Sequence, residues 1–249
     1  MKTDAACPVC GAAGRAPLFE KGGHAYLRCT GCGFIMSEAR AAAGALAAAY
    51  DAAYTGTYIA KSAAKLARCR RAVRRIVRRY VRGGRWLDVG CSAGFLVRAA
   101  QDAGFDAFGI DVEPAGIAHA REHLGLTQVE CGALDGARFA PASFDVITLY
   151  DVIEHVPDLN ATVALLARLL RPGGVIEIRT PDAGHWRTPR RLQDWNEVKP
   201  GEHLYHFTRA TLGRLLERHG LRIVARRLAL KPGLKVYVRH ANRASPPCP

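Results

Sequence analysis

The sequence predicts an α/β fold: a doubly wound, mostly parallel sheet with a small metal-bound module in front of it. Two observations predict the sheet. Strand-like apolar runs alternate with helix-like stretches from residue 83 onward, and an acidic, glycine-rich turn follows the first run. The third observation is a set of four cysteines in two C-x-x-C pairs near the start of the chain. Strands separated by helices favour a parallel sheet that is covered on both faces.

Length and composition are those of a folded globular chain. The 249 residues are 49% apolar, which is enough for one domain with a core and a small appendage. The sequence shows no apolar run of membrane-spanning length and no signal-peptide pattern, so we expect a soluble, cytoplasmic protein. The formal net charge of +14 permits binding to nucleic acid, anionic membranes or acidic small molecules, although an Arg- and Ala-rich composition produces the same excess by itself.

The first cysteines predict a structural zinc site. They form the pairs CPVC and CTGC, separated by 18 residues, and comprise Cys7, Cys10, Cys29 and Cys32. In a reducing compartment this spacing is typical of four thiolates on one Zn²⁺ rather than of disulfides. A four-thiolate site has no open position for water or substrate, so its expected role is to fold residues 1–36 as a zinc ribbon. A reactive or redox-active pair is the alternative.

Residues 37–82 are expected to form a helical linker or lid. Tyr50, Tyr54 and Tyr58 recur every four positions and share one helix face, which suits either packing or the covering of a ligand. From residue 62 to residue 81 the apolar residues keep helical spacing, while arginines occupy much of the remaining surface. Such a basic helix either exposes a solvated face or lies on an anionic surface.

Residues 83–240 alternate between strands and helices. The expected strands are RWLDVG, DAFGID, LTQVEC, FDVITLY, GVIEIRT, LRIVARRLAL and KVYVRH, and the expected helices lie near 95–103, 114–124, 160–170 and 208–219. The last two strands are close in sequence, which favours an antiparallel hairpin at the sheet edge. Residues 241–249 are expected to form a disordered tail.

The turn in LDVGCSAGFL is the first candidate for ligand binding. It joins the first strand to the first helix, and ligands of such sheets bind beyond the carboxyl ends of the strands. Gly90 and Gly94 allow close approach of a ligand to the backbone. The turn lacks both the Lys-Ser/Thr of a phosphate loop and the glycine spacing of dinucleotide binders. Asp111, about 20 residues later at the end of the second strand, can accept ribose hydroxyls, so the expected ligand carries a ribose.

Four segments taken together resemble the class I S-adenosylmethionine-dependent methyltransferases: LDVGCSAGFL, FGIDVEP, FDVITLYDVIEHVPD and LLRPGGVIEIRTP. The resemblance covers roughly residues 60–240, and it implies a seven-stranded, Rossmann-like sheet with S-adenosylmethionine laid across the turn. It assigns cofactor binding to residues after the first four strands, namely Asp88, Gly90, Cys91, Gly94, Asp111, Val112, Ala133, Leu134 and Tyr150. Ala133 stands where the family usually has an acidic residue near the adenine.

The later stretch GEHLYHFTRATLGRLLERHG resembles the branch with the ubiquinone-pathway O-methyltransferases and with relatives that act on natural products and sugars. Zinc-ribbon heads occur among these relatives, and a ribosomal RNA guanine methyltransferase also carries a metal-binding head. The resemblance therefore implies a methyltransferase for a hydroxyl of a small molecule. The alternatives are an RNA methyltransferase and a non-catalytic, cofactor-binding scaffold.

A hydroxyl acceptor must lose its proton, and histidine is the natural base near neutral pH. His203 is the first candidate for this base, ahead of His206, which precedes the expected N-cap Thr208. His155 follows the fourth strand and suits a structural or cofactor-side role equally well.

The long connection 181–207 has the length of a functional lid. Trp186 and Trp195 are expected to form walls of an acceptor site or to pack against the sheet. Arg187, Arg190 and Arg191 are candidates for binding a phosphate or carboxylate, with a solvated role as the alternative. The sequence does not indicate the acceptor or the oligomeric state.

Overall fold

The computed structural model describes residues 6–38, 62–135 and 138–241. The tyrosine face expected in the linker and the expected C-terminal tail lie outside the described residues. The chain divides into two compact units. Of the described residues, unit 1 holds 6–38, 151–164 and 178–241, and unit 2 holds 62–135, 138–150 and 165–177.

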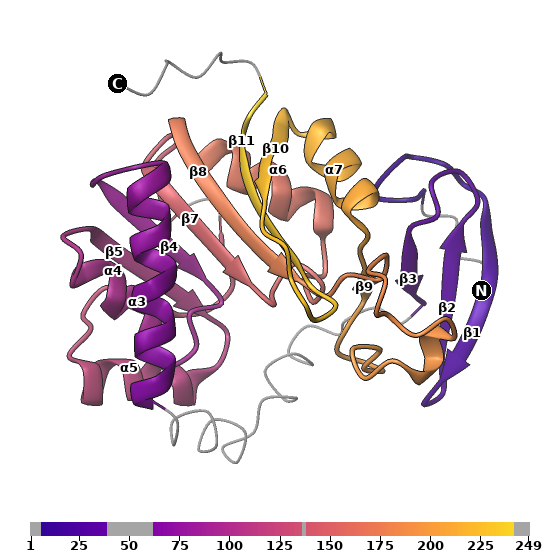
Figure 1. The fold of residues 1–249 in the computed structure, drawn as a ribbon, viewed down its shortest axis with the longest axis horizontal. Coiled ribbons are helices and arrows are strands. Elements are labelled where there is room, and N and C mark those ends of the chain that lie inside the picture. Colours follow the sequence, from indigo (N-terminus) through magenta and orange to yellow (C-terminus); the bar gives the residue numbers. More distant parts are fainter. Residues whose placement is uncertain (1–5, 39–61, 136–137, 242–249) are drawn as a thin grey trace. The chain divides into compact units, whose positions relative to one another are not determined.

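The seven-stranded sheet expected from the sequence is present (Figure 1). Its strands are β4 (Arg85–Val89), β5 (Asp106–Asp111), β6 (Val129–Cys131), β7 (Phe144–Tyr150), β8 (Leu170–Thr180), β10 (Leu221–Arg226) and β11 (Leu234–His240). They are ordered β10-β11-β8-β7-β4-β5-β6. β4 pairs in parallel with both β5 and β7, whereas β10 and β11 form the expected antiparallel pair. The strand order reverses between β4 and β7, which is where ligands of such sheets bind.

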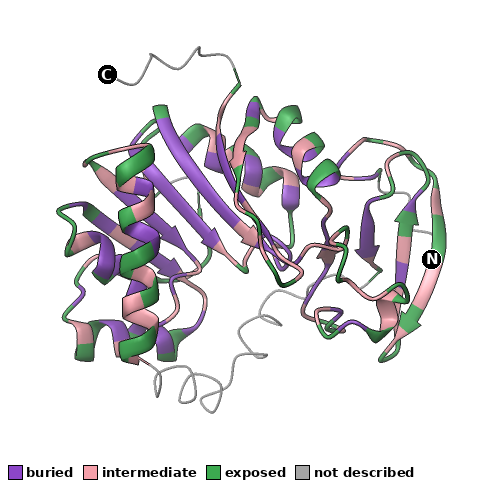
Figure 2. Cartoon of the chain, in the orientation of Figure 1, coloured by how far each residue is buried: buried purple, intermediate pink, exposed green. Residues whose placement is uncertain are grey.

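Unit 2 owes its core to strands that are buried on both faces. In β7 the side chains of Phe144, Val146, Ile147 and Leu149 are all buried, an almost continuous apolar run of the kind that parallel sheets require. Figure 2 shows this burial along β7. The helices of unit 2 are α3 (Ser62–Arg79), α4 (Phe95–Gln101) and α5 (Pro114–Leu124). A further helix, α6 (Leu159–Leu169), precedes β8.

The basic helix expected from residue 62 is α3. It contacts α4 and buries Ala72, Val73 and Ile76, so the apolar stripe faces the core as its spacing predicts. The arginines lie on the other side of the helix, and of these Arg70 forms an ion pair of 2.7 Å with Asp102. None of the described helices is long and apolar enough to cross a membrane.

Unit 1 contains a second sheet that combines three strands from residues 15–37 with one strand from residues 205–206. Its strands are β1 (Arg15–Lys21), β2 (His24–Cys29), β3 (Ile35–Ser37) and β9 (Tyr205–His206), in this order and antiparallel. β9 comes from the segment that carries two of the candidate histidines. Nothing in the sequence indicated that this segment would add a fourth strand to the sheet formed by β1, β2 and β3 near the four cysteines.

The connection between β8 and β9 contains the short helix η1 (Leu192–Asp194). Trp195 is buried against Tyr26 and Val198, so packing accounts for this tryptophan. Trp186 is 76% exposed. After β9 the chain enters α7 (Arg209–Arg218), which Thr208 caps through a reciprocal pair of hydrogen bonds with Thr211, as the sequence predicts.

Candidate active site

The glycine-rich turn of unit 2 is held against the end of β5. The backbone N–H groups of Gly90 and Cys91 both donate to the carbonyl oxygen of Ile110, at 2.8 and 3.1 Å. Gly90 and Gly94 have φ values of 75° and 76°, in the left-handed region that favours glycine. The turn therefore adopts a fixed shape that depends on glycine at both positions.

Asp88 lies beneath this turn, near the end of β4. Its side chain is buried, and its Oδ1 accepts a hydrogen bond of 2.6 Å from the hydroxyl of Thr148 on β7. Trp86 in turn donates its ring N–H to the same hydroxyl oxygen at 3.0 Å. This chain of hydrogen bonds connects β4 to β7 at the switch point.

Small residues also let α5 and β5 approach the turn closely. A Cβ atom added at Gly94 would lie 2.8 Å from the Cβ of Ala120 on α5, and one added at Gly109 on β5 would lie 2.8 Å from the sulfur of Cys91. Cys91 is buried, and this burial raises the pKa of its thiol well above its usual value. Cys91 is therefore a packed, neutral thiol and not a nucleophile.

Asp111 ends β5 beside the turn, where the sequence places it. Its Oδ2 accepts the backbone N–H of Ser92 at 2.7 Å, and its Oδ1 accepts that of Glu113 at 2.9 Å. Burial raises the pKa of this carboxyl, and the two N–H groups oppose the rise. Because a carboxylate offers about four lone-pair positions, two remain for further donors. Two ribose hydroxyls would fit them, so the donor and acceptor set suits an adenosine ligand.

The other cofactor candidates lie around the same strand ends of unit 2. Val112 directly follows Asp111, and its carbonyl oxygen is 3.9 Å from the sulfur of Cys131 at the end of β6. Ala133 is exposed and Leu134 half-buried in the segment after β6. Tyr150, at the end of β7, donates its hydroxyl to the buried carboxylate of Glu177.

The three candidate histidines are brought together in unit 1. The ring centroids of His155 and His203 are 4.6 Å apart with nearly perpendicular planes, and those of His203 and His206 are 6.3 Å apart. All three are buried. The sequence separates His155 from the other two by a helix and a strand, so only the fold produces this cluster.

Two carbonyl oxygens fix the tautomers of this cluster. The Nδ1 atom of His203 is 2.6 Å from the carbonyl oxygen of Glu197, and that of His155 is 2.9 Å from the carbonyl oxygen of Glu202. Since a carbonyl only accepts, each Nδ1 carries the hydrogen and donates it. The Nε2 atom of neutral His203 therefore keeps its lone pair.

Glu154 is the fourth member of the cluster. One atom from each of Glu154, His155 and His203 lies within 4.8 Å of the others, a spacing at which they can share a proton, a water molecule or a cation. Its Oε2 accepts the hydroxyl of Thr180 at 2.9 Å, while its buried Oε1 has no partner among the described residues. Burial, reinforced by the nearby carboxylate of Asp151, raises the pKa of Glu154 to about 8.

Burial acts on the histidines in the opposite direction. It lowers the pKa of His155 to about 4, that of His203 to about 3 and that of His206 to about 4. The neighbouring His155 lowers the pKa of His203 further. Because burial disfavours the charged form, all three rings are neutral at physiological pH.

The segment that carries the four cysteines and strands β1 to β3, residues 6–37, is called the front module. Its four cysteine sulfur atoms all lie within 4.8 Å of one another in unit 1. The sulfurs of Cys7 and Cys32 are 3.8 Å apart, and those of Cys10 and Cys29 are 3.5 Å apart. Four sulfurs placed tetrahedrally at about 2.3 Å from one zinc ion are separated by about 3.8 Å, so the geometry fits this metal.

Both cysteine turns have the same backbone. Gly11 donates its N–H to the carbonyl of Cys7 at 2.8 Å, and Gly33 donates to that of Cys29 at 2.9 Å. Both glycines have positive φ, as the glycine after each pair suggests.

Sequence reasoning missed two features of unit 1. Tyr26 of β2 lies with its ring centroid 5.6 Å from that of His206, so the front module borders the histidine cluster. Glu154, which directly precedes His155, was not among the predicted site residues, although its orphaned, buried oxygen makes it part of the cluster. Pairing between β3 and β9 causes the first feature, and such long-range pairing leaves no local signal.

Comparison with known proteins places the fold and site in context. A family model described as a methyltransferase domain matches residues 61–226, a segment that begins after the four cysteines. The ubiquinone biosynthesis O-methyltransferase of Methylococcus capsulatus is 40% identical over 105 residues, which are 39% of this chain and 44% of the relative. That of Thiobacillus denitrificans is 38% identical over 103 residues, again 39% of this chain and 44% of the relative. The matches thus span less than half the length of these relatives.

A solved S-adenosylmethionine dependent methyltransferase from Mesorhizobium loti is similar in fold. It has a TM-score of 0.54 and 22% identity, over 68% of this chain and 96% of that chain. This likeness supports the order of strands and helices, and the family match covers more than half of the sequence. The chain therefore belongs to the methyltransferase domain family.

Proposed function

We propose that this protein transfers the methyl group of S-adenosylmethionine to a hydroxyl of a small molecule, such as a natural product, a quinone precursor or a sugar. The observation that carries the proposal is the fixed turn beside Asp111 at the switch point, in a chain of the methyltransferase domain family. The similarity to ubiquinone biosynthesis O-methyltransferases supports oxygen as the methylated atom. When bound, S-adenosylmethionine supplies an electrophilic methyl carbon on a positively charged sulfur.

In this proposal the residues of unit 2 bind and orient the cofactor. Asp111 accepts two ribose hydroxyls at the positions that its backbone partners leave open. The backbone of Gly90, Cys91 and Gly94 lies against the methionine part, above Asp88. Val112, Ala133, Leu134 and Tyr150 border the adenosine and the crevice. Holding the reacting atoms close and aligned supplies about 7–11 kcal/mol of the barrier in favourable cases.

His203 is the proposed general base. Its Nδ1–H is committed to Glu197, so Nε2 is the atom that would accept the proton of the acceptor hydroxyl. Burial lowers the pKa of this ring to about 3, so the ring is neutral at physiological pH but weakly basic, and the role requires its pKa to rise when the acceptor binds. The rings of His155 and His206 lie beside it. We assign His155 and His206 to positioning of His203.

We further propose that Cys7, Cys10, Cys29 and Cys32 hold a structural Zn²⁺ and make residues 1–36 a zinc ribbon. The sulfur separations and the paired glycine turns support this assignment. Such a metal replaces the core that a module of this size lacks. Residues 83–240 would then form the methyltransferase domain.

The test uses the purified protein with S-adenosylmethionine labelled in the methyl group and a cell extract separated into small molecules and RNA. We expect label in the small-molecule fraction, at a rate that depends on salt far less steeply than RNA binding would. Label in RNA alone, with binding that falls steeply with salt, would overturn the small-molecule proposal. Cofactor binding by calorimetry without label in either fraction would instead leave a non-catalytic scaffold.

His203→Asn tests the base, because the asparagine amide can replace the Nδ1–H donor but provides no Nε2. With the acceptor found above, we expect kcat to fall by about 100-fold or more. Affinity for S-adenosylmethionine should stay unchanged. His219→Asn is the matched control, since His219 bonds to Asn160 outside the cluster. Full turnover by His203→Asn would remove this residue from the role.

A further inference from the structure

Unit 1 contains a cavity between the front module and the connection that follows β8. Its volume is about 320 Å³. The front module contributes Arg28, Gly33 and Ile35, and the remainder of the lining comes from residues 183–185, 188–190 and 192 together with Thr208. Pockets for small molecules begin at about this size.

The ionisable side chains that line this cavity are all basic: Arg28, His185 and Arg190. His185 is already committed, because its Nε2 donates to the carbonyl of Ala229 at 3.0 Å and its Nδ1 accepts the backbone N–H of Arg187 at 3.1 Å. Arg28 and Arg190 form no side-chain hydrogen bond or ion pair with any described residue. Two uncompensated guanidinium groups therefore line the same cavity.

The other two arginines of the connection 181–207 are committed elsewhere. Arg187 donates to the carbonyl of Leu230 at 3.0 Å and lies over the ring of Trp186. Arg191 forms an ion pair of 3.5 Å with Asp194. Within the basic connection, only the arginine that lines the cavity lacks a partner among the described residues.

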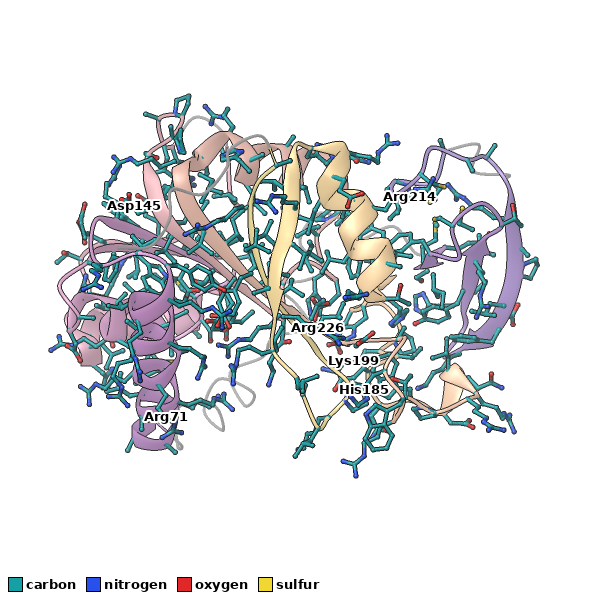
Figure 3. All side chains as sticks on the ribbon, turned by 45° about the horizontal axis from the view of Figure 1, so that its top comes forward. Arg71, Asp145, His185, Lys199, Arg214 and Arg226 are labelled. Atoms are coloured by element: carbon teal, nitrogen blue, oxygen red, sulfur yellow. The ribbon has the colours of Figure 1, made fainter. Side chains whose placement is uncertain are left out.

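The polar lining groups besides the arginines are satisfied within the protein. Thr188 donates its hydroxyl to the carbonyl of Asp182 at 2.7 Å, and Gly184 donates its N–H to the carboxylate of Asp182 at 2.9 Å. That carboxylate also lies near His185 and Arg226, which Figure 3 labels. Thr208 caps α7. The free hydrogen-bond donors offered to a ligand are thus the guanidinium groups.

Strand register connects this cavity with the histidine cluster. Arg28 on β2 pairs directly with Ile35 on β3, and Ile35 pairs directly with His206 on β9. Residues that are directly opposite in antiparallel strands have side chains on the same face of the sheet. Arg28, Ile35 and His206 therefore form a row on one face, with a free cation at one end and a candidate site residue at the other.

From these observations we infer that the cavity binds the anionic group of the methyl acceptor, which is a hydroxylated molecule that carries a carboxylate or a phosphate. The guanidinium groups of Arg28 and Arg190 bind the anion, as arginine does for both groups. Ile35, Ala183, Pro189 and Leu192 contact the carbon skeleton. The inference rests on the proposed function for the identity of the ligand as the acceptor, and it gives the front module a direct part in substrate selection.

Calorimetry with the full chain and three probes tests the inference: protocatechuate, which carries a carboxylate, catechol, which lacks it, and inorganic phosphate. We expect protocatechuate to bind about tenfold or more tightly than catechol, and phosphate to compete with it. Arg28→Gln and Arg190→Gln should each weaken anion binding about tenfold, whereas Arg191→Gln, the matched control, should not. Added salt should weaken wild-type binding, because both groups are near the surface.

The two arginine variants also separate the sources of the anion. A larger loss for phosphate than for protocatechuate identifies a phosphorylated acceptor, and the reverse identifies a carboxylate. No binding of either anion at millimolar concentration, or equal binding by wild type and both variants, overturns the anion subsite. Anion binding that depends on the arginines, without methyl transfer to any acceptor, keeps the subsite and overturns the proposed function.

Discussion

Among single residues, Asp111 makes the proposed contact between the turn and a ribose. Asp111→Asn replaces an acceptor that bonds to two backbone N–H groups with an amide that has one accepting atom. We expect affinity for S-adenosylmethionine to fall by about 10- to 100-fold, because hydrogen bonds to a charged group contribute about 1.5–3 kcal/mol. Calorimetry measures the change directly.

Asp106→Asn provides the matched control for Asp111→Asn. Asp106 begins the same strand and forms an exposed ion pair of 3.2 Å with Arg85. Exposed pairs contribute little, so this variant should bind the cofactor as the wild type does. Equal affinity for all three proteins would contradict the role of Asp111.

Local motifs made Asp111 and the turn predictable, because strand, turn and acidic residue follow one another in the sequence. The row from Arg28 through Ile35 to His206 was not predictable in this way. His206 is far from Ile35 in the chain, and no periodicity of either segment encodes their pairing. Residues that acquire a shared role only through a long-range strand pair leave no signal in a single sequence.

At the scale of secondary structure, we expect the front module to depend on its four cysteines. β3 has only three residues, and a short sheet of this kind cannot stand without additional stabilisation. Cys32→Ser should remove bound zinc and destabilise β1 to β3, together with β9, which pairs with β3. Metal analysis and hydrogen exchange of the backbone amides would detect the two effects.

Cys131→Ser is the control for this prediction, since Cys131 is exposed at the end of β6 in unit 2. Its zinc content and amide protection should equal those of the wild type. Unchanged protection of residues 24–37 and 205–206 in Cys32→Ser would show that the module folds without its metal.

The whole molecule shows which fold-level features a sequence carries. Apolar runs such as FDVITLY, with helices between them, predicted the α/β fold class and the number of strands in the large sheet. They could do so because strands buried on both faces must be almost continuously apolar. The sequence did not reveal that the front module belongs to the same compact unit as residues 178–241. The domain boundaries read from the chain order stay predictions.

Four buried titratable groups of the histidine cluster in unit 1 give a final prediction about stability. His155, His203 and His206 have pKa values lowered to about 4, 3 and 4, so their contribution is present above the ordinary value of 6.5 and is lost on acidification. Glu154 has its pKa raised to about 8, so its contribution is lost as the pH rises through that value.

The histidines and Glu154 change the free energy of unfolding in opposite directions as the pH falls. Between about pH 6.5 and pH 5 the unfolded chain gains up to three protons on histidines, while folded Glu154 holds one that the unfolded chain has released. The contribution of these four groups to the free energy of unfolding should therefore fall by about 3 kcal/mol over this range, and it should be nearly flat from about pH 6.5 to pH 8. Urea unfolding of the full chain at about pH 5, 6.5 and 8, without a chelator, measures both parts of the curve.

Two variants should change the decrease in the free energy of unfolding between about pH 6.5 and pH 5 in opposite directions. Glu154→Gln removes the opposing group, so the loss to about pH 5 should increase to about 5 kcal/mol. His206→Phe removes one neutral ring whose nitrogens have no hydrogen-bond partner among the described residues, so the loss should decrease by about 1–2 kcal/mol. Identical acid slopes in the wild type and both variants would mean that these groups titrate at ordinary values, and the dry cluster on which the proposed base depends would then be open to water.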